Sequence, residues 1–114
     1  MQVENSKLDE AEIMLEKLQD IKDQEGIIGY ILRGSKSASI DLKDPTKIIE
    51  YAVLSSTAYD VSQNMTKTLQ MGEVDNLVVE SENTKVLSTC INDHQVTIFM
   101  EKNVDHSKLC KNLK

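Results

Sequence analysis

The sequence predicts one α+β domain whose sheet is packed on both faces. Apolar residues recur at spacings of three and four in two long segments, residues 6–24 and 45–71, as amphipathic helices require. Five short runs rich in β-branched residues alternate with turn residues, which is typical of strands joined by short connections. In the last run Val96 and Ile98 face one side and Phe99 faces the other, as expected for a sheet covered on both sides.

Length and charge limit the function classes. The chain of 114 residues suffices for one domain, residues 1–114, and is too short for two. Its apolar fraction of 39% is modest, which leaves room for a partner, usually a second copy, to cover apolar surface. The formal net charge of −6 argues against nucleic acid, because phosphate binding needs clustered Lys and Arg, and against an anionic membrane surface.

Hydropathy and cysteine usage indicate where the protein works. No run of about 18 apolar residues occurs, and the N-terminal segment is polar and acidic, so we expect neither membrane insertion nor a signal peptide. Two cysteines, Cys90 and Cys110, are too few for a disulfide framework. The expected location is therefore the reducing cytoplasm.

The N-terminal third predicts a helix and two strands. The helix covers residues 6–24, with Ser6 as its N-cap and Gly26 just past its end. The strands follow at residues 27–32 and 38–42, with a turn between them.

The second helix is the most informative segment. Asp44 as N-cap and Pro45 in the first turn predict its start, and Gly72 predicts its end after about Met71. One apolar stripe runs along its whole length: Tyr51, Leu54, Ala58, Val61, Met65 and Leu69. A second apolar face covers its first half: Ile48, Ile49, Ala52, Val53, Ser56 and Tyr59. Since a helix on one sheet needs a single stripe, we expect the sheet to cover one face and another element to cover the second. A single broad stripe in a deep core is the alternative.

The C-terminal part predicts three strands and a short helix. The strands are residues 76–81, 85–91 and 95–101, joined by polar turns that suit hairpins. The last helix has Asp105 as its cap and two leucines spaced four residues apart.

Three segments carry a family resemblance. In LQDIKDQEGIIGYIL, residues 18–32, an amphipathic helix ends and Gly-apolar-x-Gly opens a strand. EVDNLVVESENTKVLST, residues 73–89, leads from the long helix into a hairpin, and VTIFMEKNVDHSKLCKNLK, residues 96–114, closes the chain with a strand and a short helix. In this order the segments resemble the roadblock (dynein light-chain) family. One departure is the turn at residues 33–36, RGSK, where the family commonly has Asp-Gly.

The resemblance implies a fold, an assembly and a role. The fold is a five-stranded antiparallel sheet with helices on both faces. The assembly is a homodimer formed through the long second helix and the edge strand after it. The residues expected in the dimer interface are Ile49, Ala52, Val53, Ser56, Tyr59, Leu77 and Val79. Family members are non-enzymatic subunits that gather or regulate small Ras-like GTPases, or link motor complexes to cargo. The resemblance thus implies an adaptor without a cofactor, whose partners are a second copy and a small GTPase.

Acidic residues on the first helix suggest where that partner docks. Asp9, Glu12 and Glu16 are suited to steer a basic partner by long-range attraction. A solvated helix face explains the same residues equally well.

The stretch GYILRGSKS, residues 29–37, imitates a phosphate-binding loop. Such a loop places its Lys directly after Gly at the start of a helix, whereas here Ser35 separates Gly34 from Lys36 and a strand follows. We therefore expect a strand and a turn, and no nucleotide site.

An alternative function class rests on cysteine and histidine. Cys90, His94, His106 and Cys110 are ligand types of tetrahedral zinc, and a small enzyme or a ligand- or metal-binding domain would build its pocket around the first three. However, a Cys and a His four residues apart on a strand do not converge readily, and core cysteines are far commoner than ligands. No oxyanion motif accompanies a Cys–His pair. We therefore expect no catalytic, cofactor or metal site.

Overall fold

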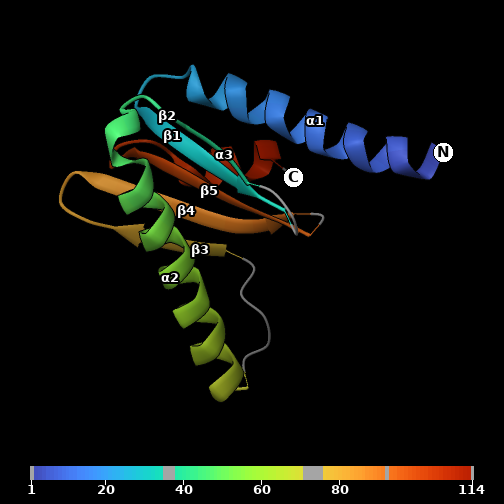
Figure 1. Ribbon diagram of the computed structural model, residues 1–114. Helices are drawn as coiled ribbons and strands as arrows, with labels where there is room; N and C mark the ends of the chain where they lie inside the picture. Colours follow the sequence, from blue (N-terminus) through green and yellow to red (C-terminus); the bar gives the residue numbers. More distant parts are fainter. Residues whose placement is uncertain (1, 35–37, 71–75, 92, 114) are drawn as a thin grey trace.

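The computed structural model contains three α-helices and five strands within the residues that it describes (Figure 1). The elements are α1 (Gln2–Lys22), β1 (Ile27–Arg33), β2 (Ala38–Leu42), α2 (Ile48–Thr68), β3 (Asn76–Glu80), β4 (Thr84–Ile91), β5 (His94–Glu101) and α3 (His106–Leu113). The described residues are 2–34, 38–70, 76–91 and 93–113, without the side chains of residues 2–11, 48, 52 and 54–56. The predicted order of elements is confirmed, and the strand limits differ from the prediction by a single residue at most.

The strands form one antiparallel sheet in the order β2-β1-β5-β4-β3. The hairpin β1–β2 and the meander β3–β4–β5 join through the central pair β1 and β5. Strands β2 and β3 are therefore the two edges of the sheet. The predicted class, a five-stranded antiparallel sheet in an α+β domain, is confirmed.

Both faces of the sheet are packed, as the alternation in β5 predicts. Val96, Ile98 and Met100 belong to a core shared with α1 and α3, whereas Phe99 belongs to a smaller core on the α2 side. The larger core consists of Met14, Leu18, Ile21, Ile27, Tyr30, Leu32, Leu87, Val96, Ile98, Met100, Leu109 and Leu113. The smaller core has Ile31, Leu42 and Phe99 at its centre. Among the described side chains, α2 therefore contributes to the smaller of the two cores.

The first helix is longer than its sequence pattern predicts. It begins at Gln2, so Ser6 lies inside the helix and the predicted N-cap is wrong. The preceding residues contain neither Gly nor Pro, and nothing in them stops the helix from extending. At its other end Gly26 has φ +88°, and its carbonyl accepts a hydrogen bond from the Glu101 N–H at 2.7 Å. This left-handed turn is accessible to Gly at little cost, and it leads the chain directly into β1.

Acidic caps begin the other two helical segments, as predicted. Asp44 Oδ1 accepts hydrogen bonds from Thr46 Oγ1 at 2.6 Å and Thr46 N at 3.1 Å, and these bonds hold the pKa of Asp44 below its ordinary value. The first turn, Pro45–Lys47, is a 3₁₀ turn, and α2 then ends at Thr68 instead of Met71. Gly72, the predicted stop signal, lies outside the described residues. Asp105 Oδ1 likewise accepts hydrogen bonds from two backbone N–H groups in the first turn of α3.

The segment whose sequence imitates a phosphate-binding loop belongs to a β-hairpin. Residues 27–33 form β1, and residues 38–42 form its antiparallel partner β2. Ser35 and Lys36 lie outside the described residues. No described helix is both long enough and apolar enough to cross a membrane.

Gly29 lies at a close approach between β1 and β2. The register of β1 against β5 shifts between Ile27 and Gly29, which marks a β-bulge. A Cβ atom on Gly29 would lie 2.5 Å from the Asp41 carbonyl oxygen and 2.7 Å from Leu42 Cα. Both are backbone atoms, so no side-chain rotation can relieve the overlap.

We therefore expect Gly29→Ala to lower the free energy of unfolding by at least about 2 kcal/mol, because the backbones of β1 and β2 must move apart. Urea unfolding measures the change. The exposed Ser39 on β2 supplies the control, since Ser39→Ala should stay within about 0.5 kcal/mol of the parent. Equal stability of the two variants would contradict the close approach.

Candidate functional site

Helix α2 is fastened to the sheet by its first half. The Tyr51 ring lies against the Phe99 ring of β5, with centroids 4.5 Å apart. A cavity of about 320 Å³ separates the helix from the sheet beyond this contact. Its walls are Tyr51, Ala58, Leu77, Val79, Ser81, Thr84, Val86, Ser88 and Phe99. The helix therefore covers β3 and β4 loosely, over a mainly apolar hollow.

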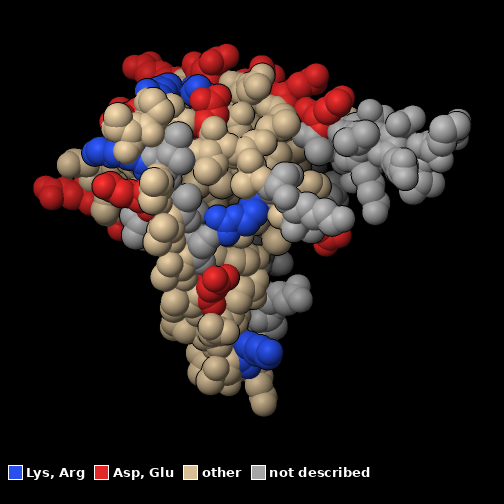
Figure 2. Space-filling view, in the orientation of Figure 1, with Lys and Arg blue, Asp and Glu red and all other residues tan. Residues whose placement is uncertain are grey.

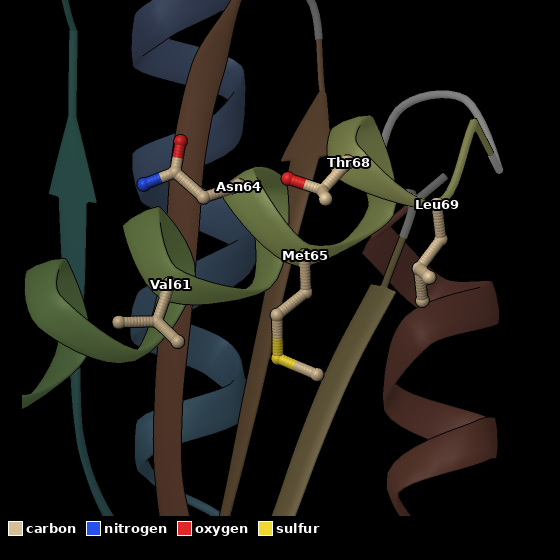
Figure 3. Close-up of a pocket in the computed structure, with 5 residues that line it drawn as sticks. All are labelled: Val61, Asn64, Met65, Thr68 and Leu69. Atoms are coloured by element: carbon tan, nitrogen blue, oxygen red, sulfur yellow. The ribbon is translucent and has the colours of Figure 1, made fainter.

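The second half of α2 projects past the β3 edge of the sheet (Figure 1). Val61, Met65 and Leu69 continue the spacing of Ala58, so they lie on the side of the helix that faces the sheet. They point to the same side around a hollow of about 400 Å³ (Figure 3). Their exposed fractions are 51%, 59% and 64%. The apolar stripe on the sheet-facing side of α2 therefore extends beyond the edge of the sheet.

The second apolar face of α2 is open as well. Ile49 is 78% exposed and Val53 is 59% exposed. Tyr59 is half-buried, and its hydroxyl accepts a hydrogen bond from Gln63 Nε2 at 2.8 Å. The side chains of Ala52 and Ser56 lie outside what the structure describes. The alternative of a single stripe in a deep core is wrong, because Ile49 and Val53 contact no such core.

Strand β3 is the sheet edge over which α2 projects. Leu77 and Val79 line the cavity under α2, and Val78 points to the opposite face. Val79 is 45% exposed, and Leu77 is half-buried. An edge strand also presents unpaired backbone N–H and C=O groups, which favour the addition of another strand. Apolar side chains and free backbone groups therefore meet at one border of the molecule.

Comparison of the fold with solved structures shows its type. A Roadblock/LC7 domain from Streptomyces avermitilis matches with a TM-score of 0.68 at 16% identity, over 88% of this chain and 84% of that one. The chain folds as a roadblock domain. The gliding protein MglB from Thermus thermophilus matches with a TM-score of 0.68 at 15% identity, over 89% of this chain and 80% of that one.

Two further structures share the roadblock fold. MglB has also been solved in a tetrameric arrangement, with a TM-score of 0.68 at 15% identity, over 89% of this chain and 79% of that one. MglC from Myxococcus xanthus matches with a TM-score of 0.55 at 21% identity, over 88% of this chain and 89% of that one. No family model and no curated protein sequence matches the chain. The likeness is therefore one of fold, in agreement with the resemblance found in the sequence.

Acidic side chains gather on the face of the roadblock domain opposite α2. Glu12, Glu16 and Asp20 of α1 are exposed, and Figure 2 shows Asp and Glu concentrated along this side of the molecule. The side chain of Asp9 lies outside what the structure describes. The projecting part of α2 is mainly uncharged in the same view. The two faces thus differ in character, one acidic and one apolar.

The cysteines and histidines do not form a common pocket. In β4, Thr89 pairs with Asn76 on the α3 side of the sheet, so the next residue, Cys90, faces the α2 side. His94 alternates with Val96 and faces the α3 side, as does His106. Among the described residues no three His, Cys, Asp or Glu side chains gather as metal ligands. The structure therefore does not bring together the pocket around Cys90, His94 and His106 on which the alternative function class depends.

The sequence interpretation missed the exposed half of the α2 stripe. The spacing places Val61, Met65 and Leu69 on one stripe with Tyr51 and Ala58, and it does not indicate that this stripe extends beyond the sheet. The missed signal is length: 21 residues of helix span about 31 Å, whereas five strands span only about 19 Å between the outer two. A stripe that covers the whole helix must therefore extend beyond the sheet unless the helix runs along the strands.

The Tyr51–Phe99 contact should decide whether α2 stays on the sheet. We expect Tyr51→Ala to lower the free energy of unfolding by about 2–4 kcal/mol, since it removes the ring that anchors the helix. Hydrogen exchange should then accelerate in α2 more than in β1 and β5. Tyr51→Phe keeps the ring and should stay within about 0.5 kcal/mol. Uniform acceleration across the sheet and α2 would show that the helix is not a separately anchored layer.

Proposed function

We propose that the protein is a non-enzymatic, homodimeric adaptor that binds or regulates a small Ras-like GTPase in the cytoplasm. The main observation in favour of a dimer is the apolar stripe of α2, which extends past the β3 edge of the sheet. The GTPase role is supported by the roadblock fold together with the family resemblance of the sequence. The structure of MglB in a tetrameric arrangement shows that one protein of this fold self-associates.

The direction of the stripe indicates what covers it. Ala58 lies over the cavity above β3, and Met65 and Leu69 follow on the same side of the helix, beyond that strand. A surface that covers them must therefore continue the plane of the sheet past β3. A second copy supplies such a surface when its own β3 pairs edge to edge with the first. Each α2 would then rest on two sheets, with its distal stripe over the partner's β3 and β4.

We propose that the second face of α2 also takes part in the dimer. We place Ile49 and Val53 in the contact between two α2 helices that cross the shared edge in opposite directions and lie side by side. Full burial of such a side chain contributes roughly 1.5–3 kcal/mol. Five such side chains on each copy, all more than half exposed, would contribute on the order of 10 kcal/mol. This lies within the roughly 4–15 kcal/mol that association costs, so the β3 pairing and the cavity must add to it.

In the proposed role the protein binds and orients its partner and supplies no catalytic group. A regulator without catalytic groups acts by binding one state of its partner more tightly than another. The acidic face of α1 would remain exposed in the dimer, since α1 and α2 lie on opposite faces of the sheet. We propose Asp9, Glu12 and Glu16 as part of the surface that attracts a basic region of the GTPase.

The dimer should depend on both apolar regions of α2. Val53→Glu and Met65→Glu should each yield a monomer, because a charge buried at a dry interface costs several kcal/mol unless it is paired. Size-exclusion chromatography with light scattering measures the mass against 12.8 kDa for one chain. Asp23→Lys, at an exposed position just after α1, should remain dimeric. A parent mass of one chain would refute the dimer, and a dimeric Met65→Glu variant would refute the role of the distal stripe.

The acidic face should affect the rate of partner binding. We expect the double reversal Glu12→Lys and Glu16→Lys to leave the dimer intact and to slow association with the cognate GTPase, most strongly at low salt. Stopped-flow measurements across a salt series test this. Lys17→Glu, on the same helix, is the control with the opposite sign and should not slow association. Unchanged association kinetics in the double variant would refute docking on α1 and would favour the α2 face as the docking surface.

A further inference from the structure

A second groove lies on the face of the sheet opposite α2. It runs between α3 and β3 and has a volume of about 520 Å³. Its lining is Asn76, Val78, Leu87, His106, Ser107, Cys110 and Lys111. Neither the proposed α2 interface nor the acidic face of α1 uses these side chains. We call it the α3 groove.

The base of the α3 groove is apolar. Leu87 is 1% exposed and is already packed in the larger core. Val78 is 36% exposed, although it projects from a strand into the groove. An apolar side chain of a ligand placed here would remove Val78 from water without displacing any core residue.

One polar atom of a residue in the wall has no hydrogen-bond partner among the described residues. Asn76 Oδ1 accepts hydrogen bonds from Thr89 Oγ1 at 2.7 Å and from the Cys110 thiol at 3.6 Å, so its oxygen is occupied. His106 Nδ1 is buried and has no hydrogen-bond partner in the described structure. A buried polar atom without a partner is costly, and since His106 lines the groove, a rotation of its ring would let Nδ1 bind a polar group of a ligand there.

The positive charge of α3 favours a negatively charged ligand. The helix carries Lys108 and Lys111 and no acidic residue, in a protein whose net charge is −6. Lys111 lines the groove, whereas Lys108 does not. The groove also extends along alternate residues of a strand and more than one turn of a helix, which suits a polypeptide better than a compact molecule.

We propose that the α3 groove binds an acidic peptide segment of a partner protein. An apolar anchor side chain of the peptide lies on Val78 and Leu87, and a neighbouring carboxylate pairs with Lys111. A polar group of the peptide reaches His106. This surface goes beyond the GTPase-directed function and would let the protein hold a second partner at the same time, since α2 lies on the other face.

The two cysteines provide a footprint with an internal control. Cys110 lies in the groove, whereas Cys90 is exposed and faces the α2 side. The probe is a short peptide in which a central Leu and Phe are flanked by Asp and Glu. At increasing probe concentration, alkylation of Cys110 by iodoacetamide should slow in proportion to the bound fraction, and alkylation of Cys90 should not change. Mass spectrometry of the digested protein gives both rates.

Variants of α3 test the assigned charge. Lys111→Glu should weaken probe binding by about tenfold, because it replaces an attraction with a repulsion. Lys108→Glu, on the same helix but outside the groove, should change binding much less. A probe with Lys and Arg in place of the acidic residues should not protect Cys110. Equal effects of the two variants, or no protection of Cys110 by the acidic probe up to millimolar concentration, would overturn the proposal.

A further control distinguishes binding of a peptide from binding of a small ligand. Octanoate carries one carboxylate and an apolar chain, and the proposal predicts no protection of Cys110 at concentrations where the peptide protects fully. Equal protection by octanoate would overturn the peptide assignment in favour of a small amphipathic anion. These outcomes do not depend on dimer formation through α2, and light scattering of the same samples reports that state separately.

Discussion

The structure depends on where α2 is fixed and how far it then extends. Its ring contact holds Tyr51 over β5, two strands away from the β3 edge. Two strand spacings amount to about 10 Å, whereas the helix from Tyr51 to Leu69 is about 27 Å long. A helix that crosses the strands from this point must leave the sheet with much of its length unsupported. The stripe along that length is apolar, so a single chain leaves these apolar side chains exposed to solvent.

The same border is incomplete in three different ways. Among the residues that the structure describes, the distal stripe of α2 has no sheet beneath it, the cavity under α2 is lined in part by β3, and no strand pairs with the outer side of β3. One kind of partner satisfies all three, namely a sheet that continues this one. The opposite face needs no such partner, because α1 and α3 bury the larger core there and expose mainly charged and polar groups. The proposed assembly face on the α2 side and the proposed binding surfaces on the opposite side rest on this asymmetry.

Sequence patterns predicted the fold well because they report which side of each element is apolar. The alternation in β5 placed Phe99 apart from Val96 and Ile98, and the acidic caps at Asp44 and Asp105 placed two helix starts. The N-cap at Ser6 was wrong because a capping residue does not stop a helix unless the preceding residues oppose it. Two apolar faces on α2 were visible, but periodicity gives no information on how much of a stripe the sheet can reach. The α3 groove was not predicted, since it depends on the distance between β3 and a helix 30 residues later in the chain.

The central claim is that the distal stripe of α2 lies on the sheet of a second copy. It is tested most directly by isotope-filtered nuclear Overhauser measurements on a sample that mixes labelled and unlabelled chains. The account predicts intermolecular contacts between the Met65 or Leu69 methyl groups of one copy and the Leu77 or Val79 methyl groups of the other. A dimer in which these methyl groups show contacts only within their own chain would contradict it.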